Sequence, residues 1–111
     1  KLRTITMSAY PPEKRFAVAS SDALKENERI ALALPDRKIL IFRVDGAVKA
    51  VDASCPHYGV DLADGAMEQA KLFCPACGIA FDAMTGQSST PSLTLTTYSA
   101  HEQDGIITLS L

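Results

Sequence analysis

The stretches "SCPHYGV" (residues 54–60) and "LFCPACGIAF" (residues 72–81) contain all three cysteines of the 111-residue chain and one of its two histidines. Their four metal-binding side chains are Cys55, His57, Cys74 and Cys77. The first cysteine of each stretch precedes a proline, and a glycine follows each C-x-H or C-x-x-C pair, so we predict two tight loops. Thiolate and imidazole favour zinc, copper or cluster iron over oxygen-seeking ions.

The composition indicates one ordered domain and excludes several classes of function. Hydrophobic residues make up 47% and charged residues 22% of the chain, as in ordinary globular proteins. A net charge of −2 indicates no basic surface for nucleic acid, and no apolar run is long enough to span a membrane. Three cysteines form a poor disulfide framework, which favours a reducing, cytoplasmic compartment.

Short apolar segments separated by turn residues surround the two loops. The predicted strands are residues 15–20, 29–34, 38–44, 47–52, 71–73, a short strand within 78–87, 93–100 and 106–111. Asp45-Gly46 and Asp104-Gly105 are hairpin signals, and residues 21–28 are expected to form a helical turn or a loop. This pattern predicts a small, mostly antiparallel all-β domain over residues 15–111.

Segments outside the predicted strands receive simpler interpretations. Residues 1–14 contain two adjacent prolines and are expected to form a flexible tail, with the part before Met7 either vector-derived or the front of a longer chain. His101 is expected in a solvated turn, and Tyr58 is expected to pack beside His57.

The residues alone leave several chemistries open for the two loops. An iron–sulfur cluster and a structural zinc ion would use the same four ligands, although a C-x-H pair is tighter than usual zinc spacing. A thioredoxin-like dithiol at Cys74 and Cys77 would normally open a helix, whereas the following "GIAFD" favours a strand. Cys55 and His57 as a nucleophile–base pair would leave the C-x-x-C unexplained.

The combination of "CPH", "CPAC" and "GIAFDAMTG" resembles the cluster-binding region of Rieske-type ferredoxins. The segments "KILIFRVDGAVKAVDASCPH" and "DGIITLSL" extend the resemblance over the chain beyond its tail. The resemblance implies a small antiparallel β-sandwich with a 2Fe–2S cluster at a tip formed by two loops. It also implies a third, proline-containing loop over the cluster, and Pro91 falls at that place.

One position departs from the family pattern, in which two cysteines hold one iron and two histidines hold the other. Cys77 stands where the second histidine is expected, so the ligand set becomes three cysteines and one histidine. A thiolate in place of a neutral imidazole adds a negative charge beside the iron. At an effective dielectric near 20 that charge is worth roughly 4 kcal/mol, or on the order of 100–200 mV, in favour of the oxidised cluster.

Two further positions support a low reduction potential. Ile79 and Phe81 stand where high-potential relatives place hydroxyl groups that donate hydrogen bonds to the cluster sulfurs. We therefore expect a potential below about −150 mV, the lower end for Rieske centres. The resemblance implies a one-electron carrier, not an enzyme by itself, with a reductase and a terminal acceptor such as an oxygenase as partners.

Overall fold

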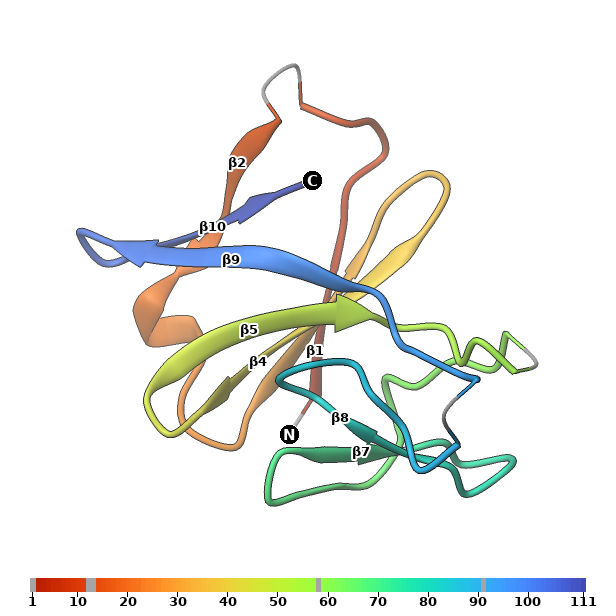
Figure 1. The fold of residues 1–111 in the computed structure, drawn as a ribbon. Helices are drawn as coiled ribbons and strands as arrows, with labels where there is room; N and C mark the ends of the chain where they lie inside the picture. The colour runs from red at the N-terminus through yellow and green to blue at the C-terminus, as the bar shows by residue number, and fades with distance from the viewer. Residues whose placement is uncertain (1, 12–13, 58, 91) are drawn as a thin grey trace.

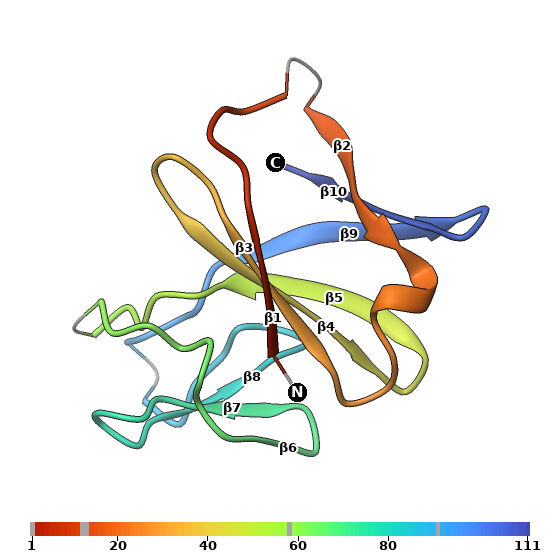
Figure 2. The ribbon, with the colours of Figure 1, turned by 180° about the vertical axis from the view of Figure 1, so that it is seen from behind.

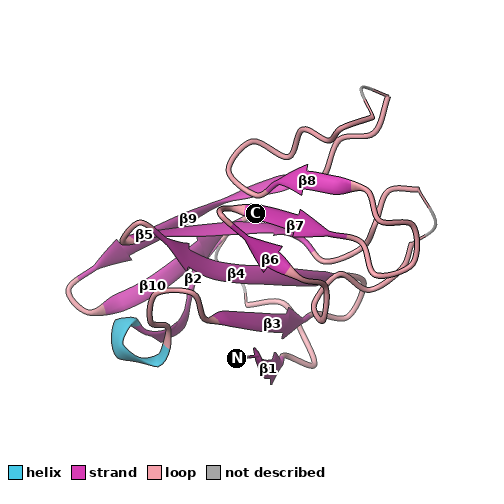
Figure 3. Ribbon diagram, turned by 90° about the horizontal axis from the view of Figure 1, so that it is seen from below, coloured by secondary structure: helices cyan, strands magenta, loops and turns pink. Residues whose placement is uncertain are grey.

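The computed structural model describes residues 2–11, 14–57, 59–90 and 92–111 and consists mainly of β-strands (Figures 1 and 2). The elements are β1 (Leu2–Thr6), β2 (Arg15–Ser20), the 3₁₀ turn η1 (Ser21–Ala23), β3 (Arg29–Ala33), β4 (Lys38–Val44), β5 (Ala47–Asp52), β6 (Met67–Glu68), β7 (Lys71–Phe73), β8 (Ala80–Asp82), β9 (Thr97–Gln103) and β10 (Ile106–Ser110). The large sheet has the order β1-β3-β4-β5-β9-β10-β2, and the small sheet has the order β6-β7-β8. Figure 3 shows the small sheet lying against one face of the large one.

The central strands β3 and β4 are buried on both faces, which explains why they are continuous apolar runs. One face contributes Ala31, Leu40 and Phe42 to a core shared with the small sheet, where Leu72 and Phe81 lie. The other face contributes a second core inside the curled large sheet, made of Ile30, Leu32, Ile39 and Ile41 together with Phe16, Ile107 and Leu109. The small sheet is therefore held to the large one by apolar packing.

Each cluster-binding stretch follows the second strand of a hairpin. In the first, β4 and β5 pair in antiparallel register around the turn Asp45-Gly46 and lead toward Cys55. In the second, β6 and β7 pair around the turn Gln69-Ala70 and lead directly into Cys74. Because both hairpins point the same way, the two loops emerge at one end of the sandwich, on the right in Figure 1.

The predicted all-β antiparallel sandwich is confirmed, and several predicted strand bounds agree with the structure to the residue: β2, β4, β5 and β7. The strand expected at residues 93–100 instead begins at Thr97 and continues to Gln103. His101 was therefore wrongly expected in a turn: it lies within β9, paired with Thr108 and half-buried. The strand ends three residues later than the apolar pattern indicates, directly before the expected Asp104-Gly105 turn.

The N-terminal segment differs from the flexible tail expected from its prolines. Leu2–Thr6 form β1, which pairs in parallel with β3, and the N–H of Met7 donates to the carbonyl oxygen of Ala33 at 2.8 Å. Leu2 and Ile5 pack against the two cores, which is the tertiary contact that the local pattern does not predict. Among the described residues, no helix is long and apolar enough to cross a membrane.

Candidate metal centre

The first loop is a tight turn closed by two backbone hydrogen bonds. The N–H of Cys55 donates to the carbonyl oxygen of Val60 at 2.8 Å, and the N–H of Gly59 donates to that of Cys55 at 2.7 Å. Gly59 has φ +70°, a left-handed conformation that glycine adopts without steric cost. Ser54 and Asp61 then pair across the base of the loop.

The second loop repeats this geometry. The N–H of Cys74 donates to the carbonyl oxygen of Ile79 at 3.0 Å, and the N–H of Gly78 donates to that of Cys74 at 2.9 Å. Gly78 has φ +73°. The shared pattern C-P-x-x-G in the two stretches therefore encodes the same backbone turn twice.

The two loops bring three sulfur atoms together. The Sγ atoms of Cys55, Cys74 and Cys77 all lie within 4.8 Å of one another. Those of Cys55 and Cys77, which belong to different loops, are 3.9 Å apart, far beyond a disulfide bond. This arrangement presents three soft donors to one small volume at the end of the sandwich.

Burial of the candidate ligands increases inward from the tip. Cys55 and Cys74 are buried, with 1% and 2% of their surface exposed, and Cys77 is intermediate. His57 is exposed on the first loop and lies outside the three-sulfur group. The structure therefore brings together three of the four residues selected from the sequence and leaves the imidazole at the outer side of the same tip.

Backbone amides of the second loop also face the sulfurs. Burial raises the pKa of the Cys74 thiol, but hydrogen bonds from the N–H of Cys77 and Ala76 and from the neighbouring thiols outweigh it and place that pKa below its usual value. The N–H of Ile79 lowers the pKa of Cys77, but burial and the two nearby thiols place it above its usual value. Three thiolates this close repel one another, so a cation between them would stabilise their charged form.

The donor set fits a 2Fe–2S cluster in its chemistry. Thiolate is the usual ligand of such clusters, and imidazole is an accepted ligand of the outward iron. Tyr58 and Pro91 lie outside the described residues, so the packing of Tyr58 beside His57 and the third, proline-containing loop remain predictions.

Two contacts beside the site join residues far apart in the chain, so the sequence alone does not indicate them. Arg29 of β3 donates to the carbonyl oxygens of Ala63 and Gly65, and Lys38 of β4 pairs with Asp61. Both cations reach the segment between the two loops. A single arginine or lysine at the end of a strand does not indicate, from its neighbours in the sequence, which distant segment it will contact.

A β-sandwich with two equivalent proline-glycine loops that direct soft donors to one end defines a domain that binds iron–sulfur or zinc. The comparisons with known proteins decide between them. The model of the Rieske [2Fe-2S] domain matches residues 14–99. The chain belongs to this family, and its cofactor is accordingly a 2Fe–2S cluster.

Individual relatives agree with this assignment. The ferredoxin component of the naphthalene 1,2-dioxygenase system of Pseudomonas putida is 31% identical over 72 residues, which are 65% of this chain and 68% of that protein. The ferredoxin of carbazole 1,9a-dioxygenase from Nocardioides aromaticivorans IC177 superposes with a TM-score of 0.78 at 22% identity, covering 86% of this chain and 96% of that one. A chain from a complex of reduced oxygenase and oxidized ferredoxin in carbazole 1,9a-dioxygenase gives 0.78 at 17% identity, covering 86% and 100%.

Proposed function

We propose that the protein is a low-potential ferredoxin that carries one electron at a time between a reductase and a terminal oxygenase, with Cys55, Cys74, Cys77 and His57 as cluster ligands. The convergence of three sulfur atoms from two loops is the observation that carries the ligand assignment. When bound, the cluster supplies one-electron transfer at nearly fixed geometry. The chain supplies ligation, burial and one exposed side.

The gradient of burial supports specific roles for the ligands. Cys55 and Cys74 are buried and are assigned to the inner iron. Cys77 is half-exposed and His57 is exposed, so these two are assigned to the outer iron, nearest the solvent and a partner. The exposure of His57 supports electron entry and exit at the tip of the two loops.

Two features of the site support a potential below that of two-histidine Rieske centres. The Cys77 thiolate adds a negative charge next to the outer iron, worth on the order of 100–200 mV. Phe81 is fully buried in the core shared with the small sheet and has no hydrogen bond to offer a cluster sulfur. Both features favour the oxidised cluster, so we place the potential below about −150 mV.

The partners and the compartment follow from the relatives and from the thiols. Relatives are named as ferredoxin components of dioxygenase systems, and one similar chain comes from a complex of ferredoxin with oxygenase. A reductase and an oxygenase are therefore the proposed donor and acceptor. None of the three described cysteines forms a disulfide bond, which supports the proposal of a reducing, cytoplasmic compartment.

The two histidines of the chain provide a matched test of the ligand set. Protein labelled with ¹⁵N-histidine is reduced, and pulsed EPR measures nitrogen coupled to the unpaired electron. We expect one strongly coupled, iron-bound nitrogen in the parent protein, its loss in His57→Ala and unchanged coupling in His101→Ala, because His101 lies in β9. Two strongly coupled, iron-bound histidine nitrogens, or strong coupling that survives in His57→Ala, would refute the assignment.

Metal analysis of the same samples tests the cofactor itself. Two iron atoms and two acid-labile sulfides per chain are expected, with visible absorption that bleaches on reduction. A colourless protein with one zinc per chain after expression with intact cluster assembly would support the zinc module instead.

A further inference from the structure

The segment Asp61–Gly65 connects the two cluster loops and contacts the base of each. The N–H of Leu62 donates to the carbonyl oxygen of Ala53 at 2.6 Å, which closes the base of the first loop. At its other end, Gly65 lies so close to the backbone of Phe73 that an added Cβ would overlap the Phe73 carbonyl oxygen. Phe73 immediately precedes Cys74, so this segment contacts the base of the first loop and the residue before the first cysteine of the second loop.

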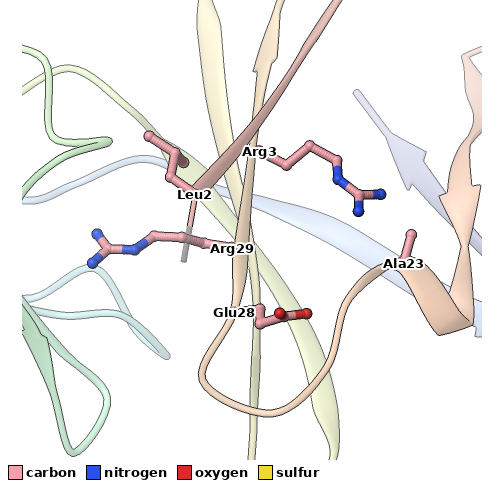
Figure 4. A pocket seen from close by; sticks show the side chains of 5 residues that line it. All are labelled: Leu2, Arg3, Ala23, Glu28 and Arg29. Carbon is pink, nitrogen blue, oxygen red and sulfur yellow. The ribbon is translucent and has the colours of Figure 1, made fainter.

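Arg29 fastens this segment to the large sheet. Its Nη1 atom donates to the carbonyl oxygens of Ala63 at 3.1 Å and Gly65 at 2.6 Å. Figure 4 shows the Arg29 side chain leaving β3 on the side opposite to Arg3. Arg29 is half-buried, and this burial lowers the pKa of its guanidinium, opposed by the charge of Asp64.

Lys38 makes a second, more exposed attachment at the other end of the segment. Its Nζ atom lies 2.6 Å from Oδ2 of Asp61, and its carbonyl oxygen accepts a hydrogen bond from Ala53 at 2.9 Å. The Oδ1 atom of Asp61 in turn accepts from the N–H of Ala63 at 2.9 Å. Because both side chains are partly exposed to water, this ion pair is expected to contribute less than the half-buried Arg29.

We propose that Arg29, assisted by Lys38, is a positioning residue that fixes the separation between Cys55 on the first loop and Cys74 on the second. This inference rests on the proposed function, which identifies the group bound by the two loops as a 2Fe–2S cluster. The planar guanidinium binds two carbonyl oxygens of the connecting segment, one of which belongs to the glycine packed on Phe73. Loss of these charge-assisted bonds leaves two partly buried carbonyl groups without that donor and allows the loops to separate.

Arg43 provides a matched control for the test. It lies on β4, and its guanidinium also binds carbonyl oxygens, those of Leu24 at 2.7 Å and Gly46 at 3.0 Å. It pairs with Glu102 as well, which lowers the pKa of that carboxyl to about 2. Arg43 therefore fastens loops of the large sheet with similar bonds but does not contact the segment between the cluster loops.

The experiment compares Arg29→Met, Arg29→Lys and Arg43→Met as cluster-loaded proteins. Release of the cluster to an iron chelator is followed by loss of visible absorption, and the EPR spectrum of the reduced protein is recorded. We expect release about tenfold faster in Arg29→Met, a broadened EPR spectrum and partial rescue in Arg29→Lys. Arg43→Met should lower the melting temperature at least as much, yet keep the parent release rate and EPR spectrum.

Hydrogen exchange on the cluster-free proteins separates this proposal from the proposed function. The amides of Leu62, Ala63 and Gly65 should exchange about tenfold faster in Arg29→Met than in Arg43→Met. Equal exchange rates of these amides in Arg29→Met and Arg43→Met would overturn the positioning role. Equal rates of cluster release in two variants that lose the same stability would overturn it as well. A parent protein that binds no iron would overturn the proposed function while leaving the exchange result interpretable.

Discussion

The two cluster loops have the same closing hydrogen bonds and the same left-handed glycine, but they differ in the side chains they carry. Cys55 and Cys74 occupy the same place in the two turns, as do Gly59 and Gly78. The second soft donor comes two residues after the cysteine in the first loop and three residues after it in the second. A repeated turn thus positions the two cysteines proposed as inner ligands, whereas the proposed outer ligands, His57 and Cys77, differ in residue type and by one position in the turn.

The largest expected effect comes from making the two loops chemically alike. Cys77→His replaces a thiolate with a neutral imidazole, so the outer iron would have one imidazole from each loop. We expect the reduction potential to rise on the order of 100–200 mV, measured by protein-film voltammetry. Ala76→His is the control, because it adds the same side chain at an exposed neighbouring position.

An unchanged potential in Cys77→His, with the cluster retained, would show that Cys77 does not bind iron. A large shift in Ala76→His would show that the loop tolerates a ligand at either position. Either result would contradict the proposal that the outer ligand lies two residues after the cysteine in the first loop and three residues after it in the second.

A smaller effect tests whether the two backbones are equivalent. Gly59→Ala and Gly78→Ala each place a Cβ in a left-handed conformation, although neither Cβ would meet another atom within 4 Å. Each is expected to lower the free energy of unfolding by about 1–2 kcal/mol, and asparagine at the same sites by less. Denaturant unfolding of the cluster-free proteins measures this, and a difference of several kcal/mol between the two alanine variants would contradict equivalence.

The hairpins that lead into the loops differ more than the loops do. Both turns require positive φ at two residues: 52° and 79° at Asp45-Gly46, and 49° and 64° at Gln69-Ala70. Asp-Gly suits such a turn, whereas Gln-Ala is strained in it. The short hairpin before the second loop therefore keeps its shape through packing of Leu72 in the core and a 2.8 Å bond from the N–H of Ala83 to the carbonyl oxygen of Ala70.

The smallest expected effect comes from exchanging the turn residues. Ala70→Gly should raise the free energy of unfolding by about 0.5–1 kcal/mol, because glycine adopts positive φ without steric cost. The reciprocal change, Gly46→Ala, should lower the free energy of unfolding, because alanine is strained at φ +79° even though its Cβ would meet no atom within 4 Å. Thermal unfolding measures both, and stabilisation by Gly46→Ala would show that backbone strain does not distinguish the turns.

Much of the fold could be predicted because its signals are local. Apolar runs and Asp-Gly turns predicted β4 and β5 to the residue, and the C-P-x-x-G pattern indicated both loops. β1 and the two-residue β6 were not predicted, since their pairing partners rather than their own residues define them. For the same reason His101 was placed in a turn although β10 pairs with it.

The sequence by itself determined which atoms can bind iron and the backbone turns that carry them, because donor chemistry and glycine conformation are properties of neighbouring residues. Only the tertiary structure decided that sulfur atoms from two loops lie within 4.8 Å and that His57 stays at the exposed side. It also decided that Arg29 reaches the segment between the loops. The physical reason is that such distances depend on packing of the two sheets, which is fixed by contacts between residues distant in the chain.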